Sequence, residues 1–122
     1  MIENKNPLVL AFVGDALQTL FVRTMLAEKD LRVNDLHRLA SNEICATMQA
    51  RRYDELFDNF TEEEKDIATR ARNVKHNTVP KNCTLADYHK ATALEAVIGY
   101  NFLNKNTERL TQIFTPFLEG RS

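Results

Sequence analysis

Two acidic residues lie within apolar segments of the sequence, where a folded protein would ordinarily place leucines. Asp15 is the single charged residue of LVLAFVGDAL, and Glu95 holds the same kind of place in ATALEAVIGY. A carboxylate among apolar side chains needs a cation, a hydrogen-bond partner or a solvated cleft. Glycine inside a helix costs about 1 kcal/mol relative to alanine. Gly14 and Gly99, close to the two acids, therefore predict that two helices cross there at short range.

Such a crossing would bring the two carboxylates together, which predicts a cation site. Carboxylates at short range repel each other unless they share a proton or hold a divalent cation. Oxygen ligands, with water in the remaining positions, suit Mg²⁺, which can activate water and stabilise charge on a phosphodiester. In the alternative interpretation both acids are structural, and each pairs with an arginine or caps a neighbouring helix. The spacing by itself leaves both interpretations open.

Length and composition fit a single domain covering residues 1–122. The chain is 43% apolar and 27% charged, has a net charge of −1, and contains only three glycines and three prolines. Cys45 and Cys83 form neither a CxxC pair nor a cluster with histidine, which favours free thiols in the cytoplasm. Polar and charged side chains within the apolar stretch 7–26 argue against a membrane span, and we see no signal peptide.

Helical periodicity extends over most of the chain, and no segment has the pattern of a strand. We therefore predict an all-α helical bundle. The expected helices cover residues 7–28, 34–52, 53–60, 61–72, 85–103 and 106–119, and a loop covers residues 73–83. The expected N-caps are Asn6, Asn34, Thr61 in a capping box with Glu64, and Thr84.

Several of these segments resemble the ribonuclease III catalytic domain. FVGDA resembles the core of that family's signature, and ALEAVIGY resembles its second motif. NDLHRLAS, ARNVKHNTVPKN and YHKATALEAVIGYNFL resemble Mini-ribonuclease III, the bacterial subfamily without a double-stranded-RNA-binding domain. The resemblance extends from Pro7 to about Leu110.

The resemblance implies an all-α endoribonuclease that depends on Mg²⁺, with Mn²⁺ as a substitute, and cleaves double-stranded RNA as a homodimer. It implies 5′-phosphate and 3′-hydroxyl ends, and maturation of the large-subunit (23S) ribosomal RNA precursor. Asp15 and Glu95 correspond to the metal-binding catalytic carboxylates, and Phe12 to the aromatic residue that inserts into the partner subunit. A ribosomal-protein helper cannot be inferred from the sequence.

Three positions depart from the larger ribonucleases III, which carry further acids there. These positions are Leu8, Ala11 and Thr92 in this chain. Mini-ribonuclease III shares these departures. They imply fewer protein ligands and more water around the metal.

A basic segment before the second motif predicts contact with RNA. The candidate RNA-binding residues are Arg70, Arg72, Asn73, Lys75, His76 and Lys81. Double-stranded RNA is recognised mostly through its shape, phosphates and 2′-hydroxyls, which suits such a cluster. Alternatively, Arg70 and Arg72 simply neutralise the end of the preceding helix. The roles of His37 and Tyr88 stay open, because each also fits a packing role.

Two other functions remain alternatives. A non-catalytic module on the same fold would bind double-stranded RNA without Mg²⁺, and the carboxylates would be dispensable for affinity. A metal-dependent helical hydrolase of small nucleotides would need neither a dimeric cleft nor the basic segment.

Overall fold

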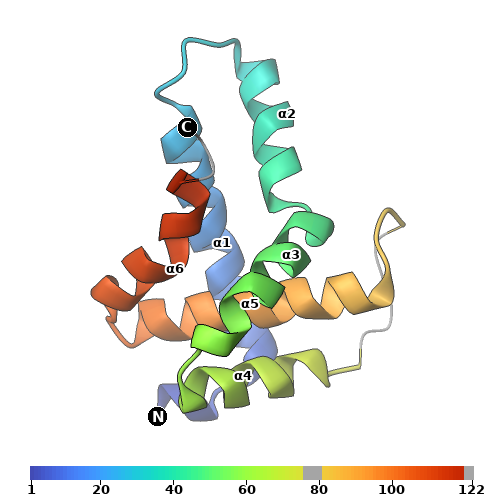
Figure 1. Cartoon of the computed structure of the whole chain (residues 1–122), viewed down its shortest axis with the longest axis vertical. Helices are drawn as coiled ribbons and strands as arrows, with labels where there is room; N and C mark the ends of the chain where they lie inside the picture. Colours follow the sequence, from blue (N-terminus) through green and yellow to red (C-terminus); the bar gives the residue numbers. More distant parts are fainter. Residues whose placement is uncertain (76–80, 120–122) are drawn as a thin grey trace.

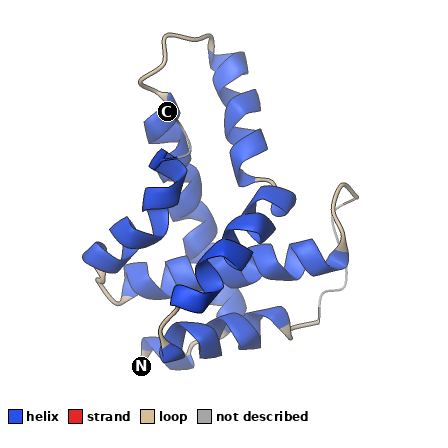
Figure 2. Cartoon of the chain, in the orientation of Figure 1, coloured by secondary structure: helices blue, strands red, loops and turns tan. Residues whose placement is uncertain are grey.

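The computed structural model describes residues 1–75 and 81–119. The α-helices are α1 (Pro7–Leu26), α2 (Val33–Ile44), α3 (Ala46–Leu56), α4 (Glu62–Arg72), α5 (Leu85–Leu103) and α6 (Thr107–Glu119), with short 3₁₀ helices η1 (Ile2–Asn4) and η2 (Phe57–Asn59). This described part of the chain contains no strand, and the all-α prediction is confirmed (Figure 2).

Helix α5 is the centre of the molecule, and the other helices pack around it. Helix α1 crosses behind it and α3 in front of it, while α4 runs along its lower side (Figure 1). Helix α6 folds back beside α1, where the ring of Phe114 stacks on Phe21 with ring centroids 4.4 Å apart. Residues on nearly every side of α5 are buried, which explains why its sequence is apolar without a clear stripe.

Several helix starts agree with the sequence. The Asn6 side chain accepts a hydrogen bond from the backbone N–H of Leu8 at 2.9 Å. Thr61 and Glu64 form the predicted capping box, with both reciprocal hydrogen bonds present. Thr84 caps α5, which spans the predicted residues. The Asn34 prediction is wrong: α2 has Arg32 at its N-cap position, with no side-chain cap, and Asn34 lies inside the first turn.

The prediction of one helix over residues 34–52 is also wrong. The chain breaks at Cys45, whose backbone is extended with φ −67° and ψ 158°, so α2 and α3 are separate helices. Neither glycine nor proline stands at the break, and the apolar period continues across it. The Arg52 side chain donates to the backbone carbonyl of Glu43 at 2.6 Å, which fixes the break from α3. Helix α2 therefore ends because of contacts with α3, such as the Arg52 hydrogen bond, and not because of the helix propensity of the residues at the break.

Helix α1 is long and apolar enough to cross a membrane by length and composition alone, with a mean hydropathy of 1.4. In this fold it packs against α5 and α2. Its buried face consists of Leu10, Ala11, Gly14, Gln18, Val22 and Leu26. The opposite face carries the exposed apolar residues Val9, Phe12 and Leu20, and Asp15 lies at the border of the buried face.

A buried ion pair ties α4, α5 and α6 together. Glu64 is 1% exposed, and both its oxygens accept hydrogen bonds from Arg109 of α6, at 2.8 and 2.9 Å. Asn101 of α5 donates to the same carboxylate at 2.8 Å. Burial alone would raise the pKa of Glu64, but these hydrogen bonds and the Arg109 charge hold it below its usual range.

Helices α1 and α5 meet backbone to backbone, as the two glycines predict. A methyl group built at Gly14 would lie 1.8 Å from the carbonyl oxygen of Glu95, and one at Gly99 would lie 1.9 Å from that of Leu10. No side chain, however small, fits between these helices at their present distance. The close crossing predicted from Gly14 and Gly99 is confirmed.

We therefore expect Gly14→Ala to destabilise the fold by more than about 3 kcal/mol, because a backbone carbonyl cannot move aside as a flexible side chain would. Equilibrium urea unfolding followed by circular dichroism would measure this loss. Thr24→Ala, an exposed substitution on the same helix, serves as control and should change stability by less than about 0.5 kcal/mol. Equal stability of the Gly14→Ala variant and the wild type would contradict the crossing.

Candidate active site

The crossing of α1 and α5 creates the cleft that holds both acids. The cleft has a volume of about 400 Å³ and is lined by Leu8, Ala11, Phe12, Asp15, Tyr88, Thr92 and Glu95. Each of these residues belongs to α1 or α5. The geometry of the site therefore depends directly on how closely these two helices cross.

The two carboxyl groups lie in contact and differ in exposure. Asp15 is exposed, so the apolar neighbours along its helix do not bury it, whereas Glu95 is half-buried. Neither acid forms an ion pair with a basic side chain in residues 1–75 and 81–119. This disfavours the interpretation in which each acid pairs with an arginine. The sequence left a solvated cleft as one alternative, and this is where the structure places the acids.

The environment of Glu95 disfavours its charged form. Burial, a hydrogen bond with Asp15 and the charge of Asp15 raise the pKa of Glu95 to about 9, while a hydrogen bond from Gln49 acts in the opposite direction. Without a cation, Glu95 is therefore protonated at neutral pH. Two carboxyl groups that cannot both ionise are an arrangement that a divalent cation would relieve.

The remaining cleft residues supply little further charge. Thr92 donates its hydroxyl proton to the backbone carbonyl of Tyr88 at 3.0 Å. Tyr88 lines the cleft, so the structure places it at the site. His37 lies elsewhere, in a separate hollow between α1 and α2.

The two arginines of the basic segment are held away from the carboxylates. Arg70 donates to Asp66 at 3.1 Å and to the backbone carbonyl of Glu3 at 2.6 Å, which ties η1 to α4. Arg72 lies over the ring of Tyr53 at 5.5 Å, in a hollow that Lys90 of α5 also lines. Lys90 follows Tyr88 by two residues, about 200° around a helix, so this hollow lies on the other face of α5 from the cleft.

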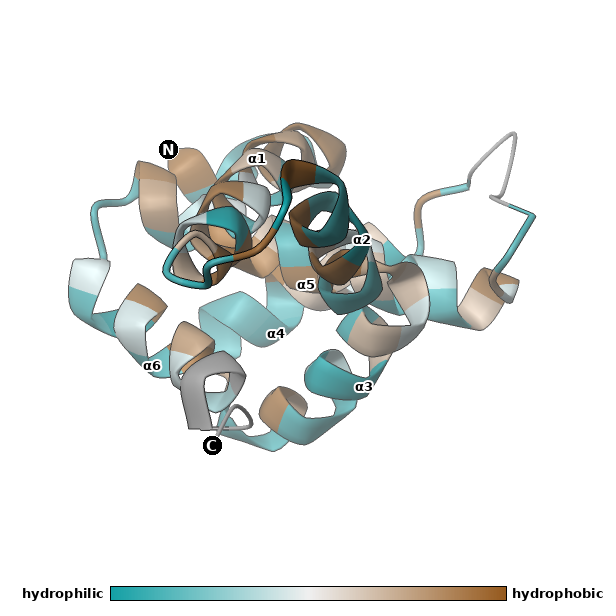
Figure 3. Cartoon of the chain, turned by 90° about the horizontal axis from the view of Figure 1, so that it is seen from above, coloured by the Kyte–Doolittle hydropathy of each residue, from teal (hydrophilic) through white to brown (hydrophobic). Residues whose placement is uncertain are grey.

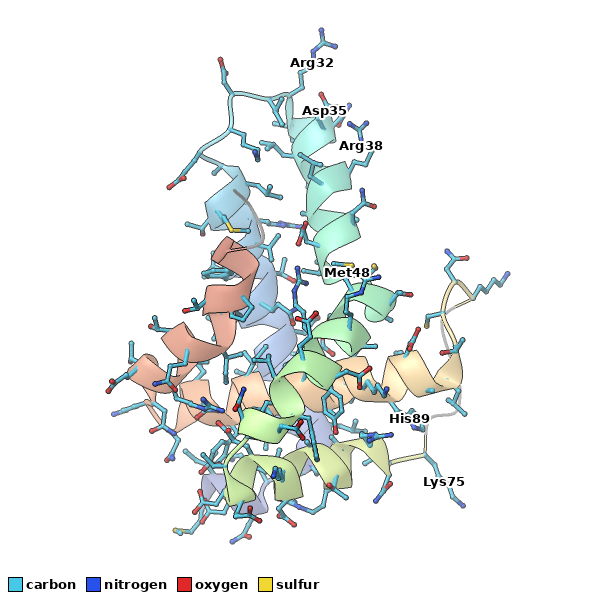
Figure 4. All side chains as sticks on the ribbon, viewed as in Figure 1. Arg32, Asp35, Arg38, Met48, Lys75 and His89 are labelled. Carbon is cyan, nitrogen blue, oxygen red and sulfur yellow. The ribbon has the colours of Figure 1, made fainter. Side chains whose placement is uncertain are left out.

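The other basic-segment candidates flank the gap in the described chain. Asn73, Lys75 and Lys81 are exposed, and Lys75 extends outward beyond the end of α4 (Figure 4). His76 lies outside the described residues. The side chains of Asn73, Lys75 and Lys81 are accessible to a ligand.

Gln49 is a site residue that sequence reasoning missed. It lies on α3, is only 5% exposed, and lowers the pKa of Glu95 against the effects of burial and of Asp15. In the sequence it stands among polar and charged residues next to an apolar face, as a solvent-facing helix position would. Only the packing of α3 on α5 shows its place, so no sequence signal could have found it.

Comparison with known proteins identifies the family. The model of the Ribonuclease III domain matches residues 8–106. Mini-ribonuclease 3 of Thermoanaerobacter sp. (strain X514) is 44% identical over 88% of this chain and 77% of that protein. Mini-ribonuclease 3 of Staphylococcus aureus is 39% identical over 93% of this chain and 87% of that protein. The crystal structure of a Fusobacterium nucleatum protein superposes with a TM-score of 0.92 at 33% identity, over 98% of this chain and 96% of that one.

The chain therefore belongs to the ribonuclease III family, within its Mini-ribonuclease 3 branch. It is an endoribonuclease. Asp15 and Glu95, which share one cleft, both lie inside the matched domain.

The contact between the acids can be measured directly. We expect the side-chain carboxyl of Glu95 in metal-free protein to titrate with a pKa of about 9 in carbon-13 NMR. Asp15→Asn removes the neighbouring charge and should lower that pKa, although burial will keep it above the ordinary 4.5. Asp30→Asn, an exposed change elsewhere, should leave it unchanged.

The same pKa has a consequence for stability. Because the pKa of Glu95 is higher in the folded than in the unfolded state, metal-free protein should lose stability as pH rises from 4.5 towards 9. Glu95→Gln should weaken that loss. An ordinary pKa for Glu95 in the wild type would show that the two carboxyl groups do not interact.

Proposed function

We propose that this endoribonuclease cleaves double-stranded RNA in a Mg²⁺-dependent reaction, with Asp15 and Glu95 as the metal-binding carboxylates. The observation that supports this most is the direct contact of two carboxyl groups with no basic partner among the described residues. Carboxylate oxygens are ligands that Mg²⁺ prefers, so the donor set fits the ion. Mn²⁺, which binds similar oxygen ligands, would substitute.

The protein would hold such an ion with few groups of its own. The described residues contain no cluster of three or more acidic, histidine or cysteine side chains. Water and phosphate oxygens would complete the shell, as Mg²⁺ commonly accepts. A bound Mg²⁺ supplies a more acidic water and stabilises negative charge on the phosphodiester.

The chain's own residues would position the substrate and the acids. Asp15 is exposed and Glu95 is half-buried, and both line the cleft. Leu8 and Ala11 form an apolar wall that limits water on one side. Hydrolysis that breaks the bond to the 3′ oxygen would give 5′-phosphate and 3′-hydroxyl ends.

Exposed polar residues on both sides of residues 76–80 favour contact with RNA phosphates. Asn73 and Lys75 follow α4 and Lys81 precedes α5, and we propose that His76, which lies outside the described residues, joins them. Arg72 would join them only by leaving Tyr53, and Arg70 is already engaged. As the biological role we propose maturation of the 23S ribosomal RNA precursor in the cytoplasm, which the resemblance of the sequence motifs to Mini-ribonuclease III implies.

A homodimer formed through α1 is the second part of this proposal. Phe12 is 78% exposed, and Val9 and Leu20 extend the apolar surface along the same helix. Viewed from above, α1 is largely hydrophobic and lies beside α2 at the edge of the molecule (Figure 3). A hollow of about 170 Å³ between these helices is lined by Arg23, Leu26, Val33, Leu36, His37 and Ala40.

A twofold axis would place the exposed Phe12 of each copy against the hollow between α1 and α2 of the other copy. Phe12 and Arg23 lie eleven residues apart on α1, about 16 Å along the helix. Two antiparallel copies of α1 would therefore bring each Phe12 to the hollow of the other copy, as a self-complementary interface requires. In such a dimer the two clefts would lie on one continuous surface.

We expect wild-type protein to cut a perfect RNA duplex with Mg²⁺ and to stop in EDTA, whereas Asp15→Asn should lower the rate at least about 100-fold and keep its fold. Gel analysis of cleavage, with circular dichroism of both proteins, measures this. Asp30→Asn, which also removes one exposed acid, serves as the charge-matched control. Duplex binding without cutting under every condition would favour the non-catalytic module, and unfolding of Asp15→Asn would make Asp15 structural.

Phe12→Ala tests the dimer. The substitution removes the aromatic anchor from an exposed position, so the monomer fold should persist while the dimer dissociates at concentrations at least about tenfold higher than for the wild type. Analytical ultracentrifugation over a concentration series measures this. Leu85→Ala, an exposed apolar residue on α5, is the matched control. A wild-type protein that stays monomeric at all concentrations would contradict the proposed dimer.

A further inference from the structure

We propose that Tyr88 is a specificity-determining residue of the active site, whose phenol hydroxyl contacts a ribose 2′-hydroxyl of the bound RNA strand. This inference rests on the proposed function, because it concerns how double-stranded RNA lies in the cleft. It gives a role to a cleft residue that is uncharged and is not one of the two proposed metal ligands.

The first observation is the position of Tyr88 relative to the acids. Tyr88 lines the same cleft as Asp15 and Glu95. It precedes Glu95 on α5 by seven residues, which is almost two full helix turns and about 10 Å along the helix axis. The two side chains therefore leave the same face of α5, and Tyr88 lies towards the start of the helix. A strand that extends along the cleft from the acids in this direction meets Tyr88.

The second observation is the chemistry of the other residues in the cleft. Besides the two acids and Tyr88, the described residues that line it are Leu8, Ala11, Phe12 and Thr92. Thr92 is only 6% exposed and donates its hydroxyl proton to the backbone carbonyl of Tyr88. Tyr88 is half-buried, so part of its side chain is accessible from the cleft. Among these described residues, Tyr88 is therefore the uncharged polar side chain best placed to meet a substrate.

The third observation is the order of charges along this part of the chain. Lys81 is exposed and precedes α5, which begins at Leu85, and Glu95 lies in the middle of the helix. Tyr88 lies one turn into α5, between Lys81 and Glu95 in the chain. A strand whose phosphates meet the proposed cation at the acids and the basic side chains before α5 would pass Tyr88 on the way.

A ribose hydroxyl suits Tyr88 better than a phosphate does. The described residues that line the cleft include no basic side chain, so a phosphate beside Tyr88 would lack a cation there. Duplex RNA presents its 2′-hydroxyls in a wide, shallow minor groove that side chains can reach. A phenol hydroxyl and a 2′-hydroxyl can each donate and accept a hydrogen bond. Since DNA lacks the 2′-hydroxyl, this contact would favour RNA at one position of the strand.

Tyr88→Phe tests the contact, because phenylalanine keeps the ring and removes the hydroxyl. We expect kcat/KM for an RNA duplex with one mapped cleavage position to fall about 2–10-fold, the effect of one hydrogen bond, with an unchanged circular dichroism spectrum. Duplexes that each carry a single 2′-deoxynucleotide, within about three nucleotides of the cleaved bond, then locate the contact. At one position the 2′-deoxynucleotide should lower the wild-type kcat/KM by the same factor, and it should cause no further loss in Tyr88→Phe.

Tyr53→Phe is the matched control. Tyr53 is a buried residue of α3 that lines a different hollow, and its hydroxyl has no hydrogen-bond partner within residues 1–75 and 81–119. The variant should match the wild type in kcat/KM and in its response to every 2′-deoxynucleotide. Equal losses of kcat/KM in Tyr53→Phe and Tyr88→Phe would show a general effect on packing and overturn the proposed contact.

A binding measurement covers the case in which Tyr88→Phe fails to fold, because it keeps Tyr88 in place. The Asp15→Asn variant should bind the intact duplex about 2–10-fold more weakly when the 2′-deoxynucleotide is at the position identified above, at fixed salt concentration. Equal affinity for every 2′-deoxy duplex would overturn the proposal. So would wild-type kcat/KM in Tyr88→Phe, or an unchanged response of that variant to the 2′-deoxynucleotides. Absence of Mg²⁺-dependent cleavage by the wild type would instead overturn the proposed function.

Discussion

The backbone contact between α1 and α5 is the constraint on which the rest of the structure depends. Gly14 and Gly99 let the two helices approach until the carbonyl of one lies where a side chain of the other would begin. Glu95 contributes its backbone to this contact and its side chain to the cleft. The same crossing that packs the core therefore sets the distance between the two acids. A change in the crossing would alter both the stability of the fold and the chemistry of the site.

A second set of polar contacts orders the helices around that crossing. Glu64 joins α4, α5 and α6 through Arg109 and Asn101, while Gln49 and Arg52 fix the break between α2 and α3. Buried polar groups of this kind specify one arrangement of helices more sharply than apolar packing alone, because each misplacement leaves an unpaired group.

The distribution of charge follows from that arrangement. The acids of the site share one cleft and form no ion pair with a basic side chain of residues 1–75 and 81–119, and Arg70 and Arg72 are engaged by other partners. The net charge of −1 is close to zero, but negative and positive charges are separated locally. The acids lie in the cleft, and exposed basic residues lie near the end of α4. Such a separation suits a long anionic ligand, since its phosphates can meet the basic residues while the cation proposed above would bridge it to the acids.

The sequence by itself determined the helical class, most helix ends and the close crossing, because caps, periodicity and glycines act locally or through backbone sterics. It also singled out Asp15 and Glu95, since a charge within an apolar run is visible without coordinates. Only the tertiary structure decided that Asp15 is exposed, that the helix predicted over residues 34–52 breaks at Cys45, and that Gln49 is buried. These features depend on which helices pack together, and a periodic pattern describes one helix at a time.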